Sequence, residues 1–157
     1  MKLSTKGRYA VMAMADLADA CEEGPVTLSD IASRQSISLS YLEQLFAKLR
    51  RAEIVASVRG PGGGYKLGRE ADEIRVSDII LAVDEPLRAT RCSEAKGCLA
   101  DGRRCITHDL WDELSRHIYL FLNSITLSDV LEQRVMGSAV GAIGLLGEQN
   151  ARPEAAE

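Results

Sequence analysis

Three cysteines and a histidine in the second half of the chain are the residues most suited to bind a metal centre. Cys92, Cys98, Cys105 and His108 follow the spacing C-x5-C-x6-C-x2-H. Thiolates and imidazole are ligands for zinc, copper(I) and iron–sulfur clusters. Structural zinc sites usually contain closely spaced cysteine pairs, which this segment lacks. The long intervals favour a bulkier centre, and four donors are enough for a 2Fe–2S cluster.

A histidine ligand would give such a cluster distinctive properties. A neutral imidazole in place of a thiolate makes the cluster less anionic and raises its reduction potential. Because imidazole binds only when deprotonated, cluster binding also becomes sensitive to pH. A cluster that is easily lost suits a sensor. A zinc site or a redox-active thiol cluster is the alternative for the same residues.

A second group of candidate residues lies on two short predicted helices, residues 28–35 and 40–51. In the second helix four apolar residues recur at i, i+3, i+4 and i+7 and predict a buried stripe. Ser40 and Glu43 have the spacing of a capping box that would begin this helix. The opposite face is polar and basic, so the pair is typical of a helix-turn-helix.

The next segment predicts a β-hairpin. Residues 54–59 and 65–67 have strand-like composition, and the run Gly60-Pro61-Gly62-Gly63-Gly64 between them favours a turn. The glycine run lacks the Gly-Lys-Ser/Thr ending of a phosphate-binding P-loop. A hairpin directly after a helix-turn-helix is a wing, so the sequence predicts a winged helix-turn-helix.

In this fold the N-terminal part of the second helix meets base edges in the major groove of DNA. Gln44 suits adenine, while Glu43 suits either the amino group of cytosine or the helix cap. Lys48 and Arg51 are expected to contact phosphates, and Arg59 a minor groove. The predicted DNA-binding residues are Ser40, Tyr41, Glu43, Gln44, Lys48, Arg51, Arg59, Gly62 and Gly63.

Four further helices complete the expected fold. Ser4 or Thr5 is expected to cap a first helix that reaches Cys21. Ser77 is expected to cap a helix that reaches Val83, and Thr126 is expected to cap a helix from Leu127 to about Gln133. A long helix from Thr107 carries an apolar stripe for which the same helix of a second subunit is the simplest partner. The stripe consists of Leu110, Leu114, Ile118, Phe121 and Ile125.

The sequence therefore predicts a mainly α-helical protein with a small β-wing. Residues 1–84 are the expected winged-helix DNA-binding domain, residues 85–133 the cluster-binding loop and dimerisation helix, and residues 134–157 a disordered tail. The net charge is −4, but residues 1–69 hold 10 Lys and Arg against 7 Asp and Glu. A locally basic surface on an acidic chain suits contact with phosphates.

Composition excludes other classes of protein. The chain has 157 residues, of which 46% are hydrophobic, so it can form a core. It lacks an apolar run long enough for a membrane helix and has no signal-peptide pattern, so we expect a cytoplasmic protein. It shows no catalytic constellation, which disfavours an enzyme or electron carrier. A winged helix that binds only proteins is a further alternative.

Several of these segments resemble the IscR family of iron–sulfur cluster regulators. The resemblance covers about residues 1–133, and its strings are far more specific than a generic wing pattern. The matching stretches are residues 3–11, 38–46, 58–65, 82–85 and 90–92.

This resemblance implies a homodimeric transcription factor, mainly a repressor of iron–sulfur cluster assembly genes. It implies one 2Fe–2S cluster per subunit, supplied by the cluster-assembly machinery, with cluster occupancy altering the choice of promoter. The ligands it implies are Cys92, Cys98, Cys105 and His108, and it implicates Glu43 in promoter selectivity. The interval from Cys98 to Cys105 is one residue longer than the commonest family pattern.

Overall fold

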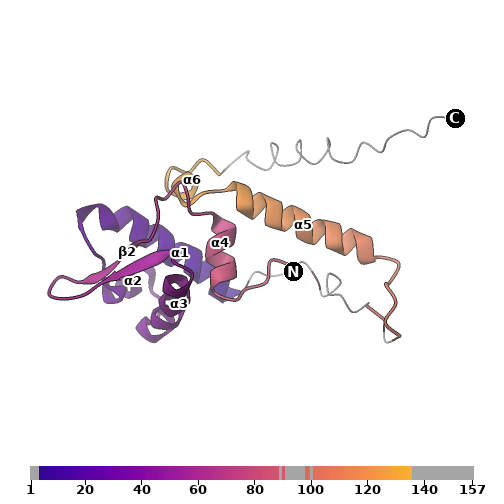
Figure 1. Cartoon of the computed structure of the whole chain (residues 1–157), viewed down its shortest axis with the longest axis horizontal. Helices are drawn as coiled ribbons and strands as arrows, with labels where there is room; N and C mark the ends of the chain where they lie inside the picture. The colour runs from indigo at the N-terminus through magenta and orange to yellow at the C-terminus, as the bar shows by residue number, and fades with distance from the viewer. Residues whose placement is uncertain (1–3, 89, 91–97, 100, 136–157) are drawn as a thin grey trace.

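The computed structural model describes residues 4–88, 90, 98–99 and 101–135 (Figure 1). The predicted ligand Cys92 and the predicted tail beyond residue 135 lie outside the described residues. The described chain is mainly helical with one two-stranded antiparallel sheet, as the sequence predicts. No helix in this part of the chain is long and apolar enough to cross a membrane.

Helix α1 (Thr5–Ala20) is the centre of the fold. The Ser4 hydroxyl accepts a hydrogen bond from the Lys6 amide and caps the helix, as expected. The small side chains of Ala10 and Ala13 are fully buried, so neighbouring helices approach α1 closely. Helices α2, α3, α4 and α6 all pack against α1, and a short 3-10 turn, η1 (Cys21–Glu23), ends it.

Helices α2 (Leu28–Gln35) and α3 (Leu39–Arg51) form the predicted helix-turn-helix. Thr27 caps α2 by accepting a hydrogen bond from the Asp30 amide, and Ser36 turns the chain with a left-handed backbone (φ 54°).

The capping box predicted at Ser40 and Glu43 is wrong. Helix α3 begins at Leu39 and its N-cap is Ser38, which has an extended backbone. The Ser38 carbonyl accepts hydrogen bonds from the amides of Tyr41 and Leu42. The tight turn at Ser36 starts the helix earlier than the Ser-x-x-Glu pattern implies, so both predicted box residues lie inside it.

Strands β1 (Val55–Val58) and β2 (Gly64–Leu67) form the predicted wing, with Val55 opposite Leu67 and Val58 opposite Gly64. A bridge between Val26 and Tyr65 joins the wing to the segment before α2. The Tyr65 ring also packs edge-on against Phe46 of α3, with centroids 5.0 Å apart. These contacts fix the wing relative to α3.

Helix α4 (Val76–Ala82) begins two residues earlier than predicted, and Ser77 is not its cap. Ser77 is fully buried, and its hydroxyl donates to Asn123 Oδ1 at 2.9 Å. Arg75 takes the N-cap position because it pairs with Thr126 in an antiparallel bridge. The Ser77 hydroxyl is therefore used in a contact with Asn123, 46 positions away, and is not available to cap the helix as the local sequence predicts.

Helix α5 (His108–Ser124) extends away from the other helices, and α6 (Leu127–Leu131) returns to them (Figure 1). Thr126 is the N-cap of α6, as predicted, whereas α5 begins one residue after the predicted start at Thr107, which is its N-cap. Leu127 is fully buried in the same core cluster as residues of α1 and α3, and its amide donates to the Ile74 carbonyl. The end of the expected second domain thus packs into the first.

Candidate nucleic-acid interface and cysteine–histidine segment

Helix α3 has two faces of opposite character. The predicted stripe is buried, and it consists of Leu42, Leu45, Phe46 and Leu49. The opposite face exposes residues at i, i+4, i+7 and i+11, namely Ser40, Gln44, Ala47 and Arg51. Ala47 was not named from sequence because alanine carries no polar chemistry. Its place on this face is set by the helical period, and its small side chain allows close approach of a partner.

The other predicted residues of α3 lie beside this face. Tyr41 is half-buried, and its ring meets Tyr9 of α1 edge-on with centroids 6.1 Å apart. Glu43 is exposed, and its side chain forms no hydrogen bond or ion pair with a described residue. Lys48 is not free in solvent, because its ammonium lies 2.7 Å from Asp84 Oδ2.

The wing carries the remaining predicted residues. Arg59 is exposed at the end of β1, directly before the glycine-rich tip. Gly62 has a positive φ of 72°, which side chains rarely adopt, and a Cβ on Gly63 would meet the carbonyls of Val58 and Gly60. These two glycines are therefore needed for the turn that presents Arg59.

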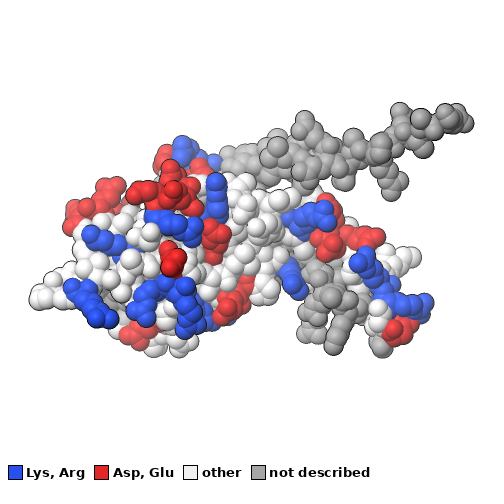
Figure 2. Space-filling view, viewed as in Figure 1, with Lys and Arg blue, Asp and Glu red and all other residues white. Residues whose placement is uncertain are grey.

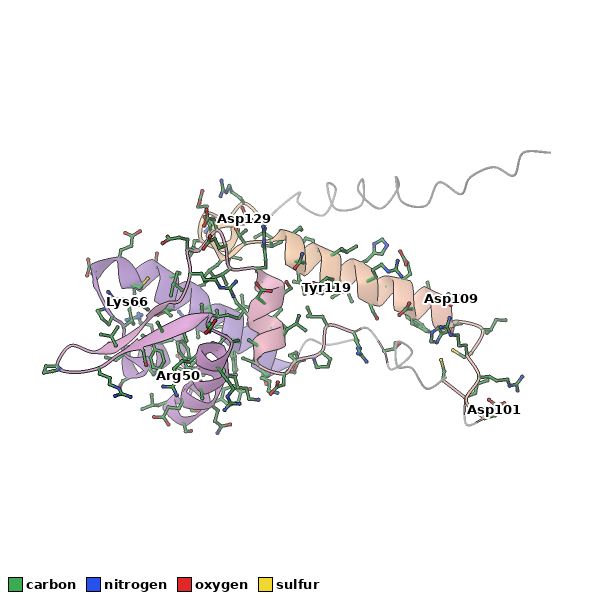
Figure 3. All side chains as sticks on the ribbon, viewed as in Figure 1. Arg50, Lys66, Asp101, Asp109, Tyr119 and Asp129 are labelled. Atoms are coloured by element: carbon green, nitrogen blue, oxygen red, sulfur yellow. The ribbon has the colours of Figure 1, made fainter. Side chains whose placement is uncertain are left out.

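Basic side chains gather over α3 and the wing in the view of Figure 2. Figure 3 labels Arg50 on α3 and Lys66 on β2 within this region. Acidic side chains lie beside the basic group, so the positive surface is narrow. The arrangement suits contact with a polyanion through one helix face and one hairpin.

Three of the predicted metal ligands, Cys98, Cys105 and His108, lie at the start of α5 and in the segment before it, the region where Figure 3 labels Asp101 and Asp109. Cys98 Sγ lies 3.0 Å from His108 Nδ1, and His108 is buried although it is the first residue of α5. Cys105 Sγ lies 3.6 Å from the Thr107 hydroxyl, which also accepts a hydrogen bond from the Trp111 indole. The structure thus brings Cys98 and His108 together.

Within the described residues, no three His, Cys, Asp or Glu side chains are arranged to hold a metal ion. Cys92 lies outside the described residues, so the complete predicted set of four is not tested by this geometry. Cys98 and Cys105 carry no disulfide and are at least partly accessible.

The apolar stripe of α5 divides into two parts. Leu110 and Leu114 are 61% and 36% exposed, whereas Ile118 and Phe121 are half-buried. Ile125 does not belong to an intersubunit stripe, because it is only 3% exposed and packs with Val76 and Ile80 of α4 in the subunit's own core.

A hollow of about 480 Å³ lies between α5 and the end of α4, and Leu81, Pro86 and Tyr119 are among the residues that line it. Leu81 and Tyr119 are 45% and 41% exposed. The exposed apolar surface of α5 therefore continues onto α4.

Comparison with known proteins agrees with this fold. Residues 3–133 match the family described as "Rrf2: Iron-dependent Transcriptional regulator". The chain belongs to the Rrf2 family. Its Rrf2 relatives are transcriptional regulators and not enzymes.

Two curated Rrf2 relatives are named HTH-type transcriptional regulator IscR. The protein of Serratia proteamaculans is 58% identical over 134 residues, which cover 85% of this chain and 81% of that protein. The protein of Aliivibrio salmonicida is 59% identical over 131 residues, which cover 83% of this chain and 77% of that protein. The predicted resemblance to IscR is thereby confirmed.

Two solved structures show the same architecture. T. potens IscR is 45% identical with a TM-score of 0.70, and the match covers 85% of this chain and 88% of that one. CymR of B. subtilis, described as a global cysteine regulator, is 38% identical with a TM-score of 0.72, and the match covers 85% and 98%.

Proposed function

We propose that this Rrf2-family regulator binds promoter DNA as a homodimer and that a 2Fe–2S cluster, one per subunit, determines which promoters it occupies. Its main activity would be repression of iron–sulfur cluster assembly genes. The contact between Cys98 Sγ and His108 Nδ1 carries the cluster assignment, because it joins the two kinds of donor that the sequence predicts.

The chemistry of the donor set fits this cluster. Cys92, Cys98 and Cys105 supply thiolates, and His108 supplies a neutral imidazole nitrogen, which is an established replacement for thiolate at 2Fe–2S iron. When bound, the cluster would connect separate positions of the chain. Its presence would depend on iron and redox conditions. The cluster-assembly machinery would be its donor, and the cytoplasm its compartment.

DNA binding is assigned to α3 and the wing. In the dimer, two α3 helices would enter successive major grooves of a roughly palindromic site, and the wings would reach the flanking minor grooves. Gln44 and Glu43 would face base edges, while Lys48 and Arg51 would face phosphates. The exposed apolar part of α5, at Leu110 and Leu114, supports the dimer.

An absorption spectrum of the anaerobically purified chain tests the cluster assignment. We expect visible bands, with iron and acid-labile sulfide near two each per chain. Cys98→Ala and His108→Ala should each abolish or shift these bands, whereas Cys21→Ala, which changes a cysteine at the end of α1, should leave them unchanged. A colourless chain after anaerobic reconstitution would contradict the assignment.

DNA binding is tested with duplexes selected from a random library by the loaded and the cluster-free chain. The two forms should select different sequences, since a ligand shifts an equilibrium only through its different affinity for two states. Identical preferences would exclude cluster-dependent promoter choice.

A thiol-redox or zinc-dependent repressor is the second candidate. It is favoured by the similarity to CymR, a protein described as a cysteine regulator, together with the accessible thiols of Cys98 and Cys105. Bound zinc, or DNA binding that responds to thiol oxidation without a chromophore, would support this candidate instead.

A further inference from the structure

The segment that follows α4 is attached to both α1 and α3 by charged contacts. Asp84 Oδ2 lies 2.7 Å from Lys48 Nζ on α3. The neighbouring Glu85 carboxylate accepts hydrogen bonds from the Ser4 amide at 3.1 Å and the Ser4 hydroxyl at 2.6 Å. In addition, Lys6 Nζ donates to the Asp84 carbonyl at 3.5 Å. Two consecutive residues thus join the end of α4 to the start of α1 and to α3.

The backbone holds Asp84 in this position. Asp84 has a left-handed backbone with φ 57°, a conformation that aspartate and asparagine adopt more readily than most residues. Its amide donates to the Leu81 carbonyl, and the Glu85 amide donates to the Ile80 carbonyl. The carboxylate is therefore directed at α3 by the turn that ends α4.

Asp84 is negatively charged at neutral pH. The hydrogen bond from Lys48 is the main cause that holds the pKa of the Asp84 carboxyl below its ordinary value, and the charges of Lys48, Lys6 and Arg51 contribute. One carboxylate thus offsets positive charge on the side of α3 that neighbours its exposed face.

The pair is accessible enough to exchange partners. The Lys48 side chain is 31% exposed and that of Asp84 is 75% exposed. Exposed ion pairs contribute little to stability, so a DNA phosphate can replace the carboxylate at Lys48.

We propose that Asp84 competes with DNA phosphate for the Lys48 ammonium and thereby limits the affinity of α3 for DNA. Asp84 is a positioning residue in this scheme, because it acts on DNA through Lys48. The inference rests on the proposed role of α3 in DNA binding. It adds an acidic regulator of that role, located at the start of the segment that leads to the cysteines.

A double-mutant cycle tests this inference with the full chain. Wild type, Asp84→Asn, Lys48→Ala and the double variant are titrated with a labelled random-sequence duplex over a range of salt concentrations. Asparagine keeps the backbone conformation of residue 84 and removes only the charge. Asp72→Asn, a change of an exposed residue outside this contact, is the control for net charge.

We expect Asp84→Asn to tighten binding about two- to fivefold and to steepen the salt dependence by up to about one unit of slope. In the Lys48→Ala background the same change should have no further effect. Asp72→Asn should bind like wild type, and thermal unfolding should show that every variant is folded.

Two results would overturn the inference while leaving DNA binding by α3 intact. One is an unchanged affinity in Asp84→Asn. The other is an equal gain in the presence and absence of Lys48, which would mean simple repulsion by Asp84. If the wild-type chain shows no salt-dependent binding to any duplex, the proposed function fails as well, so the two failures are distinguishable.

Discussion

Gln44 and Arg51 lie on the same exposed face of α3, but they offer DNA different chemistry. A glutamine amide can form two hydrogen bonds with one adenine, whereas an arginine at the end of the helix is placed for the phosphate backbone. Loss of each side chain should therefore have a different signature.

We predict that Gln44→Ala lowers the preference for a selected site over random DNA by about 1–3 kcal/mol. Arg51→Ala should weaken binding to both DNAs alike and reduce the salt slope by about one. Fluorescence anisotropy with both duplexes measures these effects. Arg116→Ala, on the exposed part of α5, is the control. Equal loss of preference in both variants would contradict the division of roles.

Asp129 stabilises the junction of α5 and α6. Its Oδ2 accepts hydrogen bonds from the Thr126 amide at 2.9 Å and hydroxyl at 2.8 Å, while the Thr126 hydroxyl accepts from the Asp129 amide. The bond from the Thr126 amide is the largest cause that lowers the pKa of the Asp129 carboxyl. The folded state therefore favours the charged form more than the unfolded state does.

This linkage has a defined sign. The stabilisation is complete above the unfolded pKa of about 3.9 and is lost as the pH falls through the lower folded pKa. We predict that Asp129→Ala lowers the unfolding free energy by about 1 kcal/mol at neutral pH and that the difference from wild type shrinks below about pH 4. Denaturant titrations across this range measure it, with the exposed Asp19→Ala as control. A difference that stays constant down to pH 3 would refute this account.

At the scale of elements, the position of the wing depends on Gly64, a glycine that lies in a strand and not in a turn. Gly64 begins β2, and a Cβ there would overlap the Val26 carbonyl, which accepts a hydrogen bond from the Tyr65 amide at 2.7 Å. Only glycine lets the strand approach this segment so closely.

We predict that Gly64→Ala lowers the unfolding free energy by about 1–3 kcal/mol, because the new methyl forces the bridge to Val26 apart. DNA affinity should fall with it, since Tyr65 also contacts Phe46 of α3. Urea titration and anisotropy test this, and Ser57→Ala in the paired strand should be close to neutral. Wild-type stability of the Gly64 variant would show that the segment before α2 can move freely.

Helix caps show what local sequence predicts and what it does not. Ser4 and Thr126 are caps as expected, and Thr27 caps α2 in the same way, because each side chain bonds within its own first turn. Ser40 and Ser77 were assigned wrongly. A left-handed Ser36 starts α3 earlier, and a distant Asn123 binds the Ser77 hydroxyl. The residue types are the same in both groups, and the differences come from the backbone turn at Ser36 and the tertiary contact with Asn123.

In the candidate sites, too, local sequence predicts some features and tertiary contacts set the others. Helical periodicity located the exposed face of α3 correctly, because burial of its apolar stripe fixes the helix rotation. Spacing could not predict the pairing of Lys48 with Asp84, since the two residues meet only when α4 ends beside α3. Ile125 had the right period for the α5 stripe, but the turn into α6 places it in the core.

At the scale of the whole molecule, the proposed dimer would form through the exposed apolar part of α5. We predict that Leu110→Glu combined with Leu114→Glu produces a monomer, because two charges cannot be buried in an apolar interface. Sedimentation velocity measures the mass. Leu39→Glu, a change of a 42% exposed leucine on α3, should leave the dimer intact. A dimer that survives the double change would place the interface elsewhere.

Leu127 connects the far end of the described chain to the DNA-binding core. We predict that Leu127→Ala costs about 2–5 kcal/mol of stability, since it leaves a cavity among fully buried residues. Calorimetry should show a lower Tm, and DNA affinity should fall near that temperature. Leu131→Ala on the same helix, where the side chain is 36% exposed, should cost much less. Equal effects of the two changes would mean that α6 is only loosely attached.

The packing of α6 against the core around α1 and α3 affects the order in which the chain folds during synthesis. A ribosome releases the chain from its N-terminus, and domains generally fold in that order during synthesis. Here the core around α3 lacks Leu127 until the cysteines and α5 have already been translated. A nascent chain therefore exposes its candidate cluster ligands before its DNA-binding unit is complete. For the proposed 2Fe–2S cluster, this order would allow insertion to begin on the ribosome, ahead of the first encounter with a promoter.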